Sequence, residues 1–207
     1  MTKTNTPDRR HKSVRAYGGI TALLLLWLCA LMWGGPAGRA DVWLSSRLYL
    51  GEGAPTAPFW VAVTELGGWM VLLGIAVLAA LYLLVRRRTR DAVFLLGVVL
   101  GVRLLVEGQK LLFARPRPDA VHLADVSSFS FPSGHSANAL ATYVVLGIVF
   151  SANRTVMLLL AVLAGLIGLS RILLGVHWPS DVLGGWALAA LCLIVATHLR
   201  GAPERQR

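Results

Sequence analysis

The segment SRILLGVHWPSD, residues 170–181, places several polar side chains in a part of the chain that is otherwise apolar. Arg171 and Asp181 border long hydrophobic runs, and His177 stands four residues before Asp181. Ionisable groups are costly to bring near a lipid bilayer and are rare in membrane segments unless they have a function. The segment therefore predicts two helix ends of a membrane protein and a candidate site between them.

The composition supports this interpretation. The chain has 207 residues, of which 56% are hydrophobic and only 14% are charged, and its mean hydropathy is +0.66. Such values are typical of membrane proteins and unlike those of soluble domains. The net charge of +10 comes from residues at the chain ends and in short loops between apolar runs. That distribution indicates membrane topology, and we expect no nucleic-acid partner.

A transmembrane helix needs about 20 mostly apolar residues. Six runs meet or approach this length: 17–34, 59–85, 92–113, 133–152, 155–174 and 181–199. The runs are continuous and do not alternate, which excludes a barrel of amphipathic strands. The predicted fold is an all-α, integral-membrane bundle of six transmembrane helices, formed by residues 17–199. Short tails, 1–16 and 200–207, flank it, and two loops, 35–58 and 114–132, lie on the side opposite the termini.

The first run has a second interpretation. Residues 1–15 are basic and precede an apolar stretch, and GRA at 38–40 resembles a signal-peptide cleavage site. The uncharged run from Ala16 to Gly38 is long enough to span a bilayer, which favours a retained helix. Removal of this segment stays open as the alternative.

The distribution of Lys and Arg predicts the orientation. With six helices, thirteen of these residues fall on the side of the two termini and six on the other. Because basic residues are enriched in cytoplasmic loops, both termini are predicted to be cytoplasmic. Lys110 and the loop after it, FPSGH at 131–135, Arg171, and HWPSD at 177–181 then all reach the outer face. Charges with a purely structural role have no reason to share one side.

Three of these residues are cations: Lys110, Arg117 and Arg171. The planar guanidinium of arginine suits bidentate binding of phosphate oxygens. We therefore expect the three side chains to bind a phosphate group.

The start of the run 133–152 adds backbone donors to this expectation. Pro132 suits the first turn of a helix, which would leave the amides of Ser133 and Gly134 free at its positive end. Glycine also allows close approach of an anion to the backbone. Ser133 and Gly134 are therefore predicted phosphate ligands, and His135 follows directly.

The two histidines and Asp181 indicate catalysis. Asp181 falls near the third position of a helix that begins at Pro179, so its carboxylate can bind one ring nitrogen of His177. This would fix the tautomer and make the other nitrogen a better nucleophile. His177 is predicted to attack phosphorus, while His135 protonates the leaving oxygen and then helps to activate water. The sequence has no carboxylate cluster suited to magnesium, so no metal or other cofactor is predicted.

Three motifs carry a resemblance to a known family. KLLFARPRP (110–118), PSGH (132–135) and SRILLGVHWPSD (170–181) resemble the three signatures of the type-2 phosphatidic-acid phosphatase superfamily. The resemblance implies a metal-independent phosphatase in which His135 is the acid, His177 the nucleophile and Asp181 its partner. It also implies that Lys110, Arg117, Ser133, Gly134 and Arg171 hold the phosphate. Soluble relatives with haloperoxidase activity are the less fitting alternative for a chain with six apolar runs.

The two outer loops are too short to form a soluble binding domain, so the expected substrate is a lipid phosphate whose tail stays in the bilayer. By family analogy we favour undecaprenyl pyrophosphate, with phosphatidic acid, phosphatidylglycerol phosphate and lipid A-type phosphates as alternatives. The expected location is the cytoplasmic membrane of a bacterium, with the active site facing outward. The oligomeric state is left open, as is a functional role for Glu65 and for the loop residues Asp119, His122 and Asp125.

A transporter or a non-catalytic scaffold is the alternative from another class. A transporter would more often hold its charges near the bilayer midplane on broken helices. A scaffold would have no need of both histidines. Phosphate release in the presence of EDTA distinguishes these alternatives from an enzyme.

Overall fold

The computed structural model describes residues 8–126 and 128–200, with side chains from residue 18 onward, so the tails at 1–7 and 201–207 lie outside the described residues. Within these ranges the chain is all-helical, without strands. The helices are α1 (Asp8–Trp33), α2 (Arg39–Leu48), α3 (Ala57–Glu65), α4 (Trp69–Val85), α5 (Thr89–Phe113), α6 (Gly134–Val149), α7 (Arg154–Leu173) and α8 (Pro179–Arg200). The expected all-α class is confirmed.

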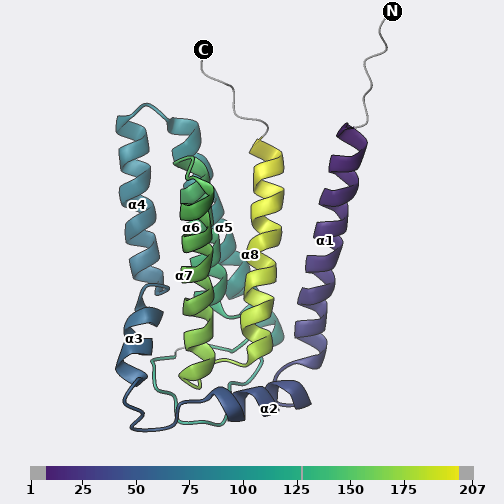
Figure 1. Ribbon diagram of the computed structural model, residues 1–207, viewed down its shortest axis with the longest axis vertical. Helices are drawn as coiled ribbons and strands as arrows, with labels where there is room; N and C mark the ends of the chain where they lie inside the picture. The colour runs from purple at the N-terminus through teal and green to yellow at the C-terminus, as the bar shows by residue number, and fades with distance from the viewer. Residues whose placement is uncertain (1–7, 127, 201–207) are drawn as a thin grey trace, which may run out of the picture.

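The long helices run side by side along one axis, and α2 lies across one end of the bundle (Figure 1). The loop that follows α5 and the connection between α7 and α8 lie at the same end as α2. The start of α1, the end of α8 and the turn between α4 and α5 lie at the opposite end. The bundle therefore has one end that gathers most of the long connections.

The helices differ from the expected runs in three details. The run 59–85 is two helices, because residues 66–68 interrupt it between α3 and α4. Gly67 sits in this break, where a Cβ would lie 2.3 Å from Ile167 Cγ2 and 3.3 Å from His135 Cδ2, so glycine permits the close approach. The loop 35–58 contains α2, which is anchored by the buried Asp41. In addition, α1 begins at Asp8, within the expected tail 1–16.

The outer surface of the bundle is apolar. Three described segments are long and apolar enough to cross a bilayer, namely Ala57–Val85, Arg154–Leu173 and Pro179–Arg200, and two shorter ones, Gly18–Trp33 and Gly134–Val149, are also apolar. Large side chains on α1, α4 and α7 are exposed, among them Leu25, Leu78 and Leu158. Exposed leucines over this extent fit a lipid-facing surface. The α5 helix carries the ionisable residues Arg103, Glu107 and Lys110 in its second half.

The core lies between α4, α5, α6 and α8, where valines and alanines such as Val99, Val102, Ala141 and Val145 are fully buried. Small residues allow close packing of helices in a membrane protein. Gly184 on α8, for example, lies directly against the ring of Phe131. This packing holds α6 and α8 together at the end where the predicted site residues lie.

Candidate active site

His177 lies in the short connection between α7 and α8. Gly175 makes this turn with a φ of +74°, and a Cβ there would lie 2.8 Å from the Tyr49 ring, so both conformation and space favour glycine. The carbonyl oxygen of Arg171 accepts hydrogen bonds from the backbone N–H groups of Val176 and His177, at 3.1 and 3.2 Å. The end of α7 therefore sets the position of the His177 backbone.

Asp181 is the third residue of α8, as expected, and is fully buried. Its Oδ2 atom lies 3.4 Å from His177 Nδ1 and accepts hydrogen bonds from the Trp178 backbone N–H at 2.9 Å and from Ser130 Oγ at 2.5 Å. Ser130 Oγ is also 3.3 Å from His177 Nδ1. The histidine is thus linked to the carboxylate both by a long direct contact and through the serine hydroxyl.

The other carboxylate oxygen of Asp181 faces Arg115. The Nη1 atom of Arg115 lies 2.7 Å from Oδ1 and 3.0 Å from Ser180 Oγ. Its Nη2 atom donates to the carbonyl oxygens of Ala30 and Leu31 at the end of α1, at 2.9 and 2.7 Å. A buried carboxylate is costly unless it is paired and hydrogen-bonded. Arg115 meets this requirement for Asp181.

The other ring nitrogen of His177, Nε2, faces Arg117 Nη1 at 3.3 Å. Burial lowers the pKa of His177 well below 6.5, and the positive charge of Arg117 lowers it further. The imidazole is therefore neutral at neutral pH. With Nδ1 directed at Ser130 and Asp181, the tautomer that carries its proton on Nδ1 leaves the Nε2 lone pair available as a nucleophile.

Arg117 itself is fixed by backbone carbonyl groups. Its Nε donates to Ser128 O at 2.8 Å, its Nη1 to Val176 O at 2.5 Å and its Nη2 to Phe129 O at 3.3 Å. These contacts join the loop after α5 to the connection before α8. The guanidinium is held beside the histidine without a carboxylate within salt-bridge distance among the described residues.

Lys110 lies at the end of α5, where its Nζ donates to Ser128 Oγ at 2.7 Å. A Cβ at Gly134 would lie 3.7 Å from this Nζ atom, so the lysine ammonium adjoins the first residue of α6. The combination of a helix N-terminus, a glycine and a lysine is suited to an anion. Two of the predicted phosphate ligands, Lys110 and Gly134, are therefore neighbours.

The expectation for Pro132 and Ser133 was wrong in detail. Pro132 lies before the helix, and Ser133 is the N-cap of α6. The Oγ atom of Ser133 accepts hydrogen bonds from the Ser136 N–H at 3.5 Å and from Ser136 Oγ at 2.9 Å. The Ser133 N–H is not free, because it donates to the carbonyl oxygen of Asp181 at 3.0 Å. This bond joins the start of α6 to the start of α8. The structure thus gives Ser133 a capping role that the sequence did not indicate.

His135 and Arg171 line a common cavity of 270 Å³, together with residues of the α3–α4 break and of the loop before α6. Arg171 is 3% exposed, and its Nη1 donates to Thr64 Oγ1 at 2.9 Å. Its Nε has no hydrogen-bond partner among the described residues. A buried guanidinium with an unpartnered nitrogen, on a residue that lines a cavity, is suited to an oxygen of an anionic ligand.

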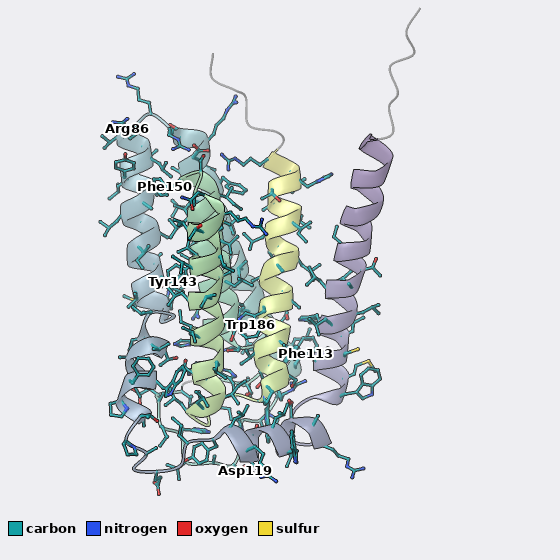
Figure 2. The ribbon with its side chains drawn as sticks, in the orientation of Figure 1. Arg86, Phe113, Asp119, Tyr143, Phe150 and Trp186 are labelled. Carbon is teal, nitrogen blue, oxygen red and sulfur yellow. The ribbon has the colours of Figure 1, made fainter. Side chains whose placement is uncertain are left out.

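Several residues of this arrangement were missed by sequence reasoning: Asp41, Thr64, Arg115 and Ser130. The carboxylate of Asp41 accepts from the N–H and the hydroxyl of Ser180 and so fixes the start of α8. The Arg115 and Ser130 positions were visible in ARPRP and FSFPSGH, next to the motifs, but only tertiary structure reveals their partners. Figure 2 shows Asp119 at the same end of the molecule as α2, and Arg86 at the opposite end.

Among the described residues, no group of three His, Cys, Asp or Glu side chains is placed to hold a metal ion. The histidines are instead next to cations. Metal independence stays a prediction.

Comparison with known proteins places the chain in a family. The sequence model of the PAP2 superfamily matches residues 91–205. The chain is 38% identical over 137 residues to phosphatidylglycerophosphatase B of Bacillus subtilis, covering 62% of this chain and 68% of that protein. It is 36% identical over 144 residues to decaprenylphosphoryl-5-phosphoribose phosphatase of Mycobacterium tuberculosis, covering 68% and 76%.

Solved structures agree with the sequence comparison. The crystal structure of a transmembrane, PAP2-type phosphatidylglycerolphosphate phosphatase from Bacillus subtilis matches with a TM-score of 0.80 and 31% identity, covering 91% of this chain and 99% of that one. That of Aquifex aeolicus LpxE matches with a TM-score of 0.66 and 26% identity, covering 77% and 96%. With motifs, fold and relatives in agreement, the chain belongs to the PAP2 superfamily and is a bacterial membrane phosphatase of lipid phosphates.

Proposed function

We propose that the protein hydrolyses a lipid phosphate through a phosphohistidine intermediate formed on His177. The observation that carries this proposal is the environment of His177: Nδ1 contacts Ser130 and Asp181, while Nε2 faces Arg117 across 3.3 Å. A neutral imidazole with one nitrogen anchored and the other directed at a cation is arranged to attack an anion bound by that cation.

In the first step, the Nε2 lone pair of His177 forms a bond to phosphorus as the bond from phosphorus to the lipid oxygen breaks. His135 donates a proton to that oxygen, which leaves as an alcohol. Lys110, Arg117, Arg171 and the N-terminus of α6 stabilise the charge on the other phosphate oxygens, where most of the barrier reduction is expected. The positive charge that develops on the His177 ring is balanced by Asp181.

In the second step, water attacks the phosphohistidine. His135 accepts a proton from that water as the bond between nitrogen and phosphorus breaks, and phosphate and the neutral His177 are regenerated. All groups in both steps come from this chain, so neither step requires a metal ion.

The class of lipid substrate is inferred from the substrates for which the relatives are named. The relatives are named for phosphatidylglycerophosphate and for a decaprenylphosphoryl phosphoribose, and we infer a substrate of this kind, a phosphate group at the membrane surface on a lipid-borne alcohol. Undecaprenyl pyrophosphate, favoured from the sequence, stays a candidate, together with phosphatidic acid and lipid A-type phosphates. No residue of the site described above is specific to undecaprenyl pyrophosphate.

The topology is part of the proposal. With six spans formed by α1, α3–α4, α5, α6, α7 and α8, both termini lie in the cytoplasm of a bacterium and the site faces outward across the cytoplasmic membrane. The support is the basic sequence Arg86, Arg87 and Arg88, which lies at the bundle end opposite the site (Figure 2). The Glu52→Cys variant, in a protein without Cys29 and Cys192, should react with a membrane-impermeant maleimide in intact cells. Protection of that cysteine until the cells are lysed contradicts the orientation.

The test of the function is phosphate release by the purified protein in detergent with EDTA, across a panel of lipid phosphates. His177→Ala should abolish release, whereas His198→Ala, at the other end of the bundle, should not. Wild-type protein quenched in alkaline detergent should also carry radiolabelled phosphate that is stable in base and labile in acid, as a phosphoramidate is. Full activity of His177→Ala, or a requirement for magnesium, would overturn the mechanism.

A further inference from the structure

The cavity beside the phosphate site contains two acidic side chains that the proposed mechanism does not use. Glu65 and Asp125 line it together with His135 and Arg171. His135 is the proposed proton donor to the departing oxygen, so the cavity lies on the side of the site where the leaving group must sit. The charge of the side chains that line this cavity therefore influences which leaving groups can bind there.

One end of the cavity is suited to bind an anion. Arg171 is buried, is held by Thr64, and has an Nε without a hydrogen-bond partner among the described residues. In the proposed function, an oxygen of the phosphate group binds this guanidinium. The phosphate position relative to the cavity is thus fixed at the Arg171 end, and the remaining volume is available to the group attached to the phosphate.

Glu65 occupies a defined place next to this end. It is the last residue of α3 and directly follows Thr64, the residue that holds Arg171. A Cβ at Gly68 would lie 3.7 Å from Glu65 Oε2, so the carboxylate lies next to Gly68 in the α3–α4 break. The negative charge of Glu65 attracts the Arg171 guanidinium. Glu65 and Asp125 are both exposed, so their carboxylates are accessible to a ligand.

Apart from Arg171, which lines the cavity itself, the nearby cations face other groups. Arg103 lies over the Trp69 ring at 5.0 Å, but it is paired with Glu107 at 3.0 Å. Lys110 donates to Ser128 on the phosphate side. With two carboxylates against the one guanidinium of Arg171, the part of the cavity away from Arg171 is acidic, whereas the phosphate side is basic.

An ionised carboxylate accepts hydrogen bonds and donates none. It favours a neighbouring hydroxyl group and repels a second phosphate. On the basis of the proposed function, we propose that Glu65, assisted by Asp125, is a specificity residue: it binds a hydroxyl group on the leaving alcohol and selects phosphate monoesters of hydroxyl-bearing lipids over pyrophosphates.

Two matched substrate pairs test this inference in the full-length protein in detergent with EDTA. The first pair is 1-oleoylglycerol 3-phosphate and its 2-deoxy analogue, which differ by one hydroxyl group. The second is farnesyl monophosphate and farnesyl pyrophosphate, which differ by one phosphate. Each is measured as kcat/KM for the wild type, Glu65→Gln, Glu65→Met and Asp125→Asn. Glu52→Gln is the control, because Glu52 is an exposed glutamate outside the cavity lining.

We expect the wild type to prefer the hydroxylated substrate by about tenfold, the scale of a single recognised polar group. Glu65→Met should remove most of this preference, since it keeps the side-chain length but has no acceptor. Glu65→Gln should raise the use of farnesyl pyrophosphate relative to the monophosphate by severalfold, and Asp125→Asn should do so less. Glu52→Gln should change neither ratio.

The inference is overturned if both ratios in the two Glu65 variants equal those of Glu52→Gln, or if only Asp125→Asn changes them. In either case the enzyme still releases phosphate and the proposed function stands. Failure of the proposed function is a different result: no phosphate release from any of the four substrates by the wild type, and no phosphoenzyme.

Discussion

Arg115 and Asp181 form a buried ion pair, with 2.7 Å between Nη1 and Oδ1 and with side chains that are 8% and 0% exposed. The guanidinium that holds this carboxylate also binds the last carbonyl groups of α1. The position of the acidic partner of His177 is therefore tied to the first helix, although 150 residues separate the carbonyl group of Leu31 from Asp181.

Replacing Arg115 by methionine should destabilise the protein and impair catalysis. The substitution leaves a buried carboxylate without its cation, and breaking a buried pair in this way costs about 3–5 kcal/mol. Thermal unfolding in detergent should show a clearly lowered Tm, with a fall in kcat. Arg39→Met, which removes an exposed arginine at the start of α2, is the matched control. An unchanged Tm in Arg115→Met contradicts the assignment of Arg115 as the counterion.

Ser130→Ala should lower kcat with little effect on KM, because Ser130 is a positioning residue that joins His177 Nδ1 to Asp181 and does not contact the phosphate. The loss of one hydrogen bond of this kind corresponds to about tenfold in rate. Ser130→Thr keeps the hydroxyl and should restore most of the activity. If alanine and threonine variants are equally impaired, the effect of Ser130 is steric and not a matter of hydrogen bonding.

The fold was predictable from hydropathy to a large extent. Each of the six apolar runs contains helix, because bilayer-spanning segments must satisfy their backbone groups internally. The break at 66–68 was not visible in the hydropathy, since Leu66, Gly67 and Gly68 are as apolar as their neighbours. The break depends on tertiary contacts: Tyr143 donates to the carbonyl oxygen of Leu66 at 2.8 Å, and Gly67 packs against His135. Helix α2 was missed for a similar reason, because Asp41 finds its partner 139 residues away, on Ser180.

The site was predictable where roles follow from residue type and spacing. His177 and Asp181 are four residues apart around a helix start, so their contact follows from local geometry. Arg115 and Arg117 have the same chemistry and lie in one loop, and no sequence rule indicates which of them faces Asp181 and which faces His177. Likewise the N–H of Ser133 was expected at the phosphate, but the adjacent start of α8 supplies a carbonyl acceptor for it.

The pH dependence of activity should report the pKa of His177. The nucleophile must be neutral, and burial followed by the charge of Arg117 lowers this pKa well below 6.5, with Arg171 and Lys110 acting in the same direction. Activity should therefore persist to acidic pH and fall only as pH drops through the lowered pKa. The unfolded chain binds this proton already near pH 6.5, so the contribution of His177 to stability is complete above that pH and decreases below it.

Arg117→Gln should move the acidic limb of the kcat/KM profile to higher pH, by about one pH unit, because one positive charge beside the imidazole is removed. The KM for lipid phosphate should rise as well, since a phosphate ligand is lost. Arg47→Gln, on the exposed surface of α2, should leave the acidic limb where it is in the wild type. An unshifted limb in Arg117→Gln indicates that another group controls it.

The need for His135 should depend on the leaving group. An alkoxide of a lipid alcohol is a poor leaving group and requires a proton, whereas p-nitrophenolate leaves without one. His135→Asn should therefore lose about 10²–10⁴-fold in the first step with a lipid phosphate, the usual contribution of a general acid, but far less with p-nitrophenyl phosphate.

Because His135 also accepts the proton of the attacking water, His135→Asn should form the phosphohistidine from p-nitrophenyl phosphate faster than it hydrolyses it. Stopped-flow measurement should then show a burst of p-nitrophenolate close to one equivalent per active site, followed by slow turnover. His177→Ala should show no burst, which is the control for its origin. Equal losses on both substrates in His135→Asn, without a burst, would mean that His135 holds the phosphate and does not transfer the proton.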